Sequence, residues 1–173
     1  MNGRAGGAGD NHTGGMKPPA GNDERPAGRM ERRSRSEIYL HFVWATYRRM
    51  PLVTDEIERA VYACIVESAR KEGCEILAVG GMPDHVHVAA KVPPRVAPAM
   101  LVKQMKGISS TLVRKQLLPG ETFGWQDGYG AFSFSRSHRE RVVAYIRNQK
   151  RHHAEAAIWA EWESLDENVN DDG

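Results

Sequence analysis

Pro83-Asp84-His85-Val86-His87-Val88-Ala89-Ala90-Lys91-Val92 is a short run of valine and alanine that contains two histidines. An apolar, β-branched run of this length is typical of a buried β-strand. Alternate residues of a strand point to the same face, so His85 and His87 should project side by side. Two imidazoles placed in this way could bind one metal ion, but the same spacing is more often incidental or structural. A second motif is therefore needed to assign a metal site.

The residues before this run predict a strand, a helix and a second strand. Residues 37–47 are aromatic and β-branched, as in a strand. Within them, His41 falls on the face opposite the main apolar set, where it is either a surface residue or part of a site. A helix over residues 54–73 has a threonine at its N-cap and a glycine at its end. Residues 75–79 predict the second strand, and 80–84 predict a tight turn into the histidine strand.

The residues after the histidine strand predict two helices separated by a short strand. Two prolines end the histidine strand, and a long amphipathic helix follows over about 97–118. A loop rich in glycine and aromatic residues, 124–130, leads to a short strand over 131–135. Ser137 could cap the last helix, which we expect over about 138–159.

The order of these elements predicts an α+β fold. Strand, helix, strand, strand, helix and strand in this order give the ferredoxin-like (βαββαβ) antiparallel sheet, with two helices on one face. The added C-terminal helix would lie on the open face and carry Tyr145. His85 and His87 would face that helix from a central strand.

Composition bounds the class of protein and its domains. The 173 residues are 40% hydrophobic and 27% charged, with a net charge of +2, as in an ordinary globular protein. No membrane-spanning run or hydrophobic signal core occurs, and the two cysteines form no metal or redox motif, so we expect a reduced, cytoplasmic protein. We expect a disordered Gly/Pro-rich tail over 1–30, one domain over 36–160 and an acidic tail over 161–173. The arginines of 29–35 are either a solvated linker or an arm for a phosphate backbone.

Tyr145 and Gln149 form the second motif of the expected site. They are four residues apart, so in a helix they lie on one face. A tyrosine hydroxyl is a poor nucleophile near neutral pH unless it is activated. A divalent ion held by His85 and His87 could polarise a phosphodiester, with Gln149 as a neutral third ligand. Alternatively, Tyr145 is only a helix residue packed on the sheet.

Three motifs together resemble the single-tyrosine HUH transposases, which include small insertion-sequence transposases and REP-associated tyrosine transposases. The motifs are Pro83-Asp84-His85-Val86-His87, Trp125-Gln126-Asp127-Gly128-Tyr129-Gly130-Ala131-Phe132-Ser133 and Tyr145-Ile146-Arg147-Asn148-Gln149. The resemblance covers roughly residues 37–153, in the family's order. It departs from the family at the two ends of the chain.

The resemblance implies metal-dependent cleavage and rejoining of single-stranded DNA in a bacterial cytoplasm, at the nucleoid. His85, His87 and Gln149 would bind Mg²⁺ or Mn²⁺, and Tyr145 would be the nucleophile that forms a 5′-phosphotyrosine. Single-stranded or hairpin DNA would be the substrate, as part of a DNA transposition reaction. Some members of the family are homodimers that exchange the tyrosine helix and others are monomers, and the sequence leaves both open.

Basic residues near the tyrosine indicate where DNA would bind. Arg147 and Lys150 are the first candidates for phosphate contacts, followed by Arg136 and by Lys106 on the polar face of the middle helix. The alternative for these charges is a solubilising surface without DNA contact. At the level of function, the alternative is a non-catalytic module that binds single strands or hairpins on the same fold.

Overall fold

The computed structural model describes residues 35–154, with side chains through Arg151. These residues belong to one compact unit that begins at Arg35. The tails expected over 1–30 and 161–173 lie outside the described residues. None of the helices in the described part of the chain is long and apolar enough to cross a membrane.

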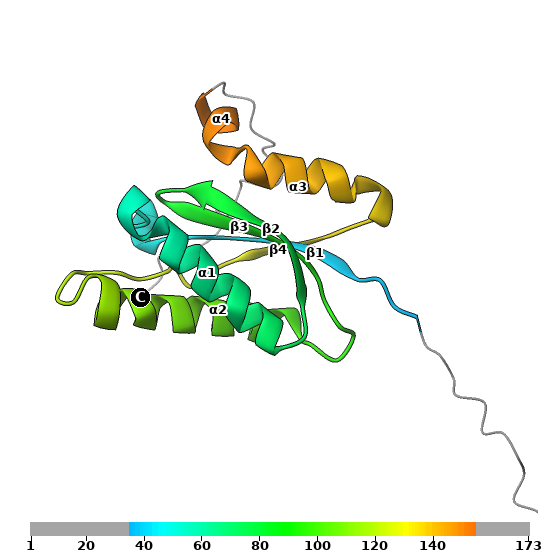
Figure 1. Cartoon of the computed structure of the whole chain (residues 1–173), viewed down its shortest axis with the longest axis horizontal. Helices are drawn as coiled ribbons and strands as arrows, with labels where there is room; N and C mark the ends of the chain where they lie inside the picture. Colours follow the sequence, from blue (N-terminus) through cyan, green and yellow to red (C-terminus); the bar gives the residue numbers. More distant parts are fainter. Residues whose placement is uncertain (1–34, 155–173) are drawn as a thin grey trace, which may run out of the picture. The chain divides into compact units, whose positions relative to one another are not determined.

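A four-stranded antiparallel sheet forms the centre of the fold (Figure 1). Its strands are β1 (Tyr39–Ala45), β2 (Glu75–Met82), β3 (His85–Lys91) and β4 (Gly130–Phe134). The spatial order is β2-β3-β1-β4, so the histidine strand is central, as predicted, and β2 and β4 are edge strands.

Helices cover both faces of the sheet (Figure 1). On one face lie α1 (Asp55–Lys71) and α2 (Pro98–Leu112), which a π-helical turn extends over Val113–Leu117. On the other face lie α3 (Arg139–Arg147) and α4 (Gln149–Ala154). Short 3-10 helices occupy Tyr47–Arg49 and Arg136–His138. The predicted α+β class is therefore confirmed.

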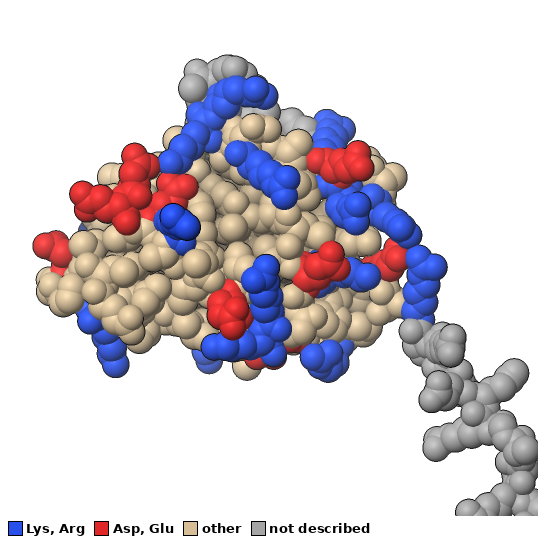
Figure 2. Space-filling view, in the orientation of Figure 1, with Lys and Arg blue, Asp and Glu red and all other residues tan. Residues whose placement is uncertain are grey.

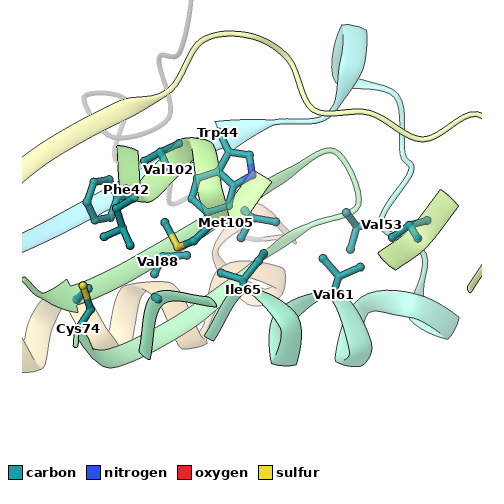
Figure 3. Close-up of a cluster of buried hydrophobic side chains, with 14 of the residues drawn as sticks. Phe42, Trp44, Val53, Val61, Ile65, Cys74, Val88, Val102 and Met105 are labelled. Atoms are coloured by element: carbon teal, nitrogen blue, oxygen red, sulfur yellow. The ribbon is translucent and has the colours of Figure 1, made fainter. Parts of the chain in front are cut away.

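The period-2 alternation of the strands divides the buried residues between the two faces. Phe42, Trp44 and Val88 point toward α1 and α2, where they pack against Ile65 and Met105 (Figure 3). Burial of each such side chain is worth roughly 1.5–3 kcal/mol, so this larger core supplies most of the stability.

A smaller core on the opposite face fixes the position of α3. Ala89 of β3 and Ala78 of β2 are small enough to let Val142, Tyr145 and Ile146 approach the sheet, and all five side chains are buried. Apolar contacts thus hold α3, the helix that carries Tyr145, next to the strand that carries the histidines.

The turn before the histidine strand is shorter than predicted. Gly80 and Gly81 continue β2 and pair with His87 and Val86, so only Pro83 and Asp84 turn the chain. A Cβ added at Gly80 would lie 2.3 Å from the backbone oxygen of Ile146. Glycine is required there because α3 lies directly against the strand, and not because the chain turns.

The continuous last helix predicted over 138–159 is also wrong. The helix is interrupted at Asn148 (φ −103°, ψ 20°), where the side-chain amide donates a hydrogen bond to the carbonyl of Ala144 (2.8 Å). The backbone N–H of Asn148 donates to the same carbonyl (3.1 Å), so α3 keeps its last helical bond and ends there; local side-chain bonds of this kind are common where asparagine ends or bends a helix. Ser137 does not cap α3, because it lies inside the preceding 3-10 helix and His138 occupies the N-cap. Residues 155–159 of the prediction lie outside the described residues.

Candidate functional site

His85 and His87 lie side by side on the face of β3 that α3 covers. Their ring centroids are 5.0 Å apart, and the rings are nearly perpendicular (82°). The ring of Tyr145 packs edge-on against His87, with centroids 5.9 Å apart. Three of the predicted site residues are thus close together, although they come from two segments separated by more than fifty positions in the sequence.

Each histidine makes a polar contact through its Nδ1 atom. His85 Nδ1 lies 2.7 Å from Asp84 Oδ1, and His87 Nδ1 lies 2.9 Å from Nε2 of the buried His41. The hydrogen bond to His85 lowers the pKa of the Asp84 carboxyl, against the opposing effect of burial. Such contacts fix the orientation of metal-binding imidazoles and direct the other nitrogen, Nε2, to the ligand position.

His41 is the residue of the site whose role could not be read from the sequence. It is fully buried, and its ring stacks on that of His87 at a centroid distance of 5.1 Å and an interplanar angle of 13°. The only sequence signal is a polar residue on the alternate face of β1. That face lies against α3, and the contact with His87 spans 46 positions.

Gln149 begins α4, directly after the break at Asn148. Its side chain is buried, and neither its Oε1 nor its Nε2 has a hydrogen-bond partner among the described residues. It lines the same cavity as Gly80 and Gly81, which pair with His87 and Val86 of the histidine strand. An unpaired buried amide costs about 1–3 kcal/mol, so this position is suited to a residue that acquires a partner when a ligand binds.

The donor set that the sequence predicts for a metal ion is two imidazoles and one amide, from His85, His87 and Gln149. The described residues contain no group of three or more His, Cys, Asp and Glu side chains that could hold a metal ion. The amide of Gln149 has no hydrogen-bond partner among the described residues, so its oxygen could serve as a third metal ligand. Two imidazoles and one amide would leave coordination positions on the ion for other oxygen atoms.

Tyr145 and the three predicted metal ligands are almost inaccessible to solvent. His87 is 0% exposed, His85 and Gln149 are 2% exposed, and Tyr145 is 3% exposed. A phosphodiester cannot reach them while α3 and α4 stay in this position.

The basic residues predicted to bind DNA all make contacts within the chain. Basic side chains lie over α3 and α4, and acidic side chains gather beside them at the start of α1 (Figure 2). The contacts are Arg136 with Glu37 (3.4 Å), Arg147 with the carbonyl of Leu77 (3.5 Å), and Lys150 with Asp55 (2.9 Å) and Glu58 (2.6 Å). The bonds to Glu58 and Asp55 raise the pKa of Lys150.

Lys106 differs from the other three because it is partly buried. Its Nζ donates hydrogen bonds to the carbonyls of Gln126, Asp127 and Gly128, and burial lowers its pKa. Lys106 therefore holds the loop before β4 against α2. DNA binding by these four residues stays a prediction.

Comparison with known proteins defines the class. Residues 34–149 match a family model described as "Transposase IS200 like". The chain therefore belongs to the IS200-like transposase family. It is a transposase, an enzyme that binds DNA and acts in DNA transposition.

Individual relatives agree with this family. The ISDra2 transposase TnpA of Deinococcus radiodurans is 25% identical over 118 residues, which are 65% of this chain and 84% of that protein. A crystal structure of a Deinococcus radiodurans protein described as a transposase has 26% identity and a TM-score of 0.52, over 68% of this chain and 95% of that one. A REP-associated tyrosine transposase solved with a REP hairpin has a similar fold, with 17% identity and a TM-score of 0.54 over 78% and 81% of the two chains.

Proposed function

We propose that this transposase cleaves and rejoins single-stranded DNA through a covalent bond to Tyr145. The hydroxyl oxygen of Tyr145 attacks the phosphorus of a phosphodiester and loses its proton. The bond from phosphorus to the 3′ oxygen breaks, and that oxygen takes up a proton. The products are a 5′-phosphotyrosine and a free 3′-hydroxyl, and the reverse attack by a 3′-hydroxyl rejoins the strands.

The observation that carries this proposal is the packing of Tyr145 against a supported histidine pair. Asp84 and His41 contact the Nδ1 atoms of the two histidines, and the ring of Tyr145 packs edge-on against His87. These two contacts hold the imidazoles in one orientation, which is the role that outer partners have at metal sites.

Nε2 of His85, Nε2 of His87 and the amide oxygen of Gln149 would hold a divalent cation, Mg²⁺ or Mn²⁺. When bound, the cation supplies Lewis acidity toward a phosphoryl oxygen. Because all three ligands are neutral, they leave the cation its full charge for an anionic phosphate. Imidazole favours Mn²⁺ over Mg²⁺ as the ion that binds more tightly.

The burial of the site has a consequence for the reaction. DNA enters only when α3 and α4 move away from β2 and β3, and the non-helical Asn148 between them is the natural hinge. Because Tyr145 packs on its own chain's His87, we favour attack in cis by a single chain. A homodimer that exchanges α3 is the alternative.

Hairpin DNA is the proposed substrate, by analogy with the REP-associated relative solved with a REP hairpin. Arg136, Arg147 and Lys150 would exchange their contacts within the chain for phosphates when DNA binds.

The fold that we propose for this site is the ferredoxin-like arrangement. The strand order β2-β3-β1-β4, with a helix after β1 and another after β3, supports it.

Labelled single-stranded hairpin DNA tests the proposal. With Mn²⁺ the wild type should give a covalent adduct on a denaturing gel, and EDTA should remove it. His85→Ala and His87→Ala should each lower the rate at least about 100-fold, whereas excess Mn²⁺ should partly restore Gln149→Ala. His138→Ala, which alters an exposed histidine, is the matched control. Full activity in EDTA would contradict the metal mechanism, and DNA binding without an adduct would indicate a binding module.

A further inference from the structure

A cavity of about 400 Å³ lies beside the catalytic residues, at the free edge of the sheet. Its walls come from α1, from residues 79–81 of the edge strand β2, and from residues 146–151 at the junction of α3 and α4. Cavities that bind small ligands start at about 300 Å³, so this one has the size for a single nucleotide.

Gly80 and Gly81 contribute backbone to the cavity wall. They belong to β2, an edge strand, so backbone groups on its outer side are not used by β3. Backbone N–H and C=O groups of this kind are common partners for the edges of ligands.

The remaining lining combines cations with an aromatic ring and neutral polar groups. Arg147, Lys150 and Arg151 contribute the positive charges, of which Lys150 is paired with Glu58 in the cavity and with Asp55. Tyr62 contributes a half-buried ring, and burial raises the pKa of its hydroxyl, which therefore stays protonated. A phosphate suits the cations, and a base suits the ring, because bases stack on aromatic side chains whatever their sequence.

The buried amide of Gln149 connects this cavity to the reaction. Gln149 lines the cavity, and both of its amide atoms lack partners among the described residues. If its oxygen faces the metal position, its NH₂ group is left to donate to a ligand in the cavity. Ile146, which also lines the cavity, is the neighbour of Tyr145 in the chain.

We propose that, once α3 and α4 have closed again on the bound strand, this cavity holds one nucleotide of the DNA strand next to the phosphate that Tyr145 attacks, with its base against Tyr62 and its phosphate on Arg147 and Arg151. The inference deepens the proposed function and rests on it for the identity of the reaction. Glu58 and Lys150 bond to each other (2.6 Å), and exchange of that bond for the edge of a base would let this acceptor and this donor distinguish bases. The cavity would thereby contribute to the choice of cleavage position.

Titration of the full-length protein with the four deoxynucleoside 5′-monophosphates, followed by NMR, tests this inference without any catalysis. The amide signals of Gly80 and Gly81 and the side-chain NH₂ signal of Gln149 should shift and saturate, with one base bound more tightly than the other three. Tyr62→Leu should weaken binding at least about fivefold, because base–aromatic stacking is removed.

Glu58→Gln should change the base preference, and it provides a second test if Tyr62→Leu proves unstable. Glu56 is an exposed residue of the same helix outside the cavity, so the control variant Glu56→Gln should change neither the affinity nor the base preference. Absence of shifts in the cavity would overturn the inference. Equal shifts from inorganic phosphate alone would also overturn it, because they would show an anion site that does not bind a base. If the nucleotides bind but the wild type forms no adduct with hairpin DNA, the proposed reaction fails and the nucleotide site stands.

Discussion

Gly80→Ala is the substitution that tests most sharply whether α3, the helix that carries Tyr145, packs directly against β2. Ordinary contacts of a Cβ begin at about 3.4 Å, but a Cβ on residue 80 would lie 2.3 Å from the backbone oxygen of Ile146. The clashing atom is a backbone oxygen, so no side-chain rotation can relieve the clash. The end of α3 must therefore shift by about 1 Å, the difference between the two distances.

Both stability and rate should respond to this shift. Overpacking of this kind costs about 1–3 kcal/mol of unfolding free energy. Tyr145 precedes Ile146, so the same displacement moves the nucleophile relative to His87. Misplacement by about 1 Å can lower a rate about 100-fold, and we expect a decrease of that order in adduct formation.

Urea denaturation and the gel-based adduct assay measure the two effects. Gly107→Ala is the matched control, because residue 107 lies in α2 and a Cβ there meets nothing within 4 Å. That variant should be more stable by about 0.5–1 kcal/mol and fully active. If Gly80→Ala were as stable and as active as the wild type, α3 would not rest on its own β2 in the working protein, and exchange of α3 between two copies would become the better account.

Three further outcomes follow from the site. His41→Ala should weaken direct Mn²⁺ binding, followed by electron paramagnetic resonance, about 10-fold to 100-fold, because the ring of His87 is then no longer oriented by a neighbouring imidazole; an unchanged affinity would make His41 a packing residue only. The double variant Arg147→Ala, Lys150→Ala should reduce the magnitude of the slope of log K against log[salt] for single-stranded DNA by about 0.7 for each phosphate that is no longer neutralised; an unchanged slope would mean that the two charges serve only the interactions within the chain. The pKa of Asp84 is lowered in the folded protein, so its stabilising contribution is complete above the ordinary pKa of 3.8 and disappears as the pH falls through the lowered pKa. The difference in unfolding free energy between the wild type and Asp84→Asn should therefore be largest near neutral pH and shrink in strong acid. A difference that is independent of pH would refute this origin.

The parts of the fold that depend on local pattern could be predicted from the sequence. The valine-rich run around His85 and His87 predicted the central strand and its two faces, since strand periodicity places both rings on one side. Thr54 does occupy the N-cap of α1, and the glycine at 73 follows its end with a positive φ of 81°. These features are decided by neighbouring residues.

The features that were wrong or missing depend on contacts between distant segments. The glycines at 80 and 81 looked like a turn, but the constraint on Gly80 is the carbonyl of Ile146, which lies far along the chain. The break at Asn148, where the side-chain amide and the backbone N–H both donate to the carbonyl of Ala144, does not show in the helical periodicity. The support that His41 gives to His87 requires the register of β1 on β3, which no local pattern specifies.

The most direct test of the central claim is to identify the residue that carries the DNA. After reaction with labelled hairpin DNA and Mn²⁺, protease digestion and mass spectrometry should find the DNA on the peptide that contains Tyr145. Tyr145→Phe keeps the ring that packs on His87 and removes the hydroxyl, so it should abolish the adduct while folding and DNA affinity stay near wild type. Tyr129→Phe, which alters an exposed tyrosine, should leave the adduct unchanged. An adduct formed by the Tyr145→Phe protein, or DNA found on Tyr129, would contradict the assignment of Tyr145 as the nucleophile.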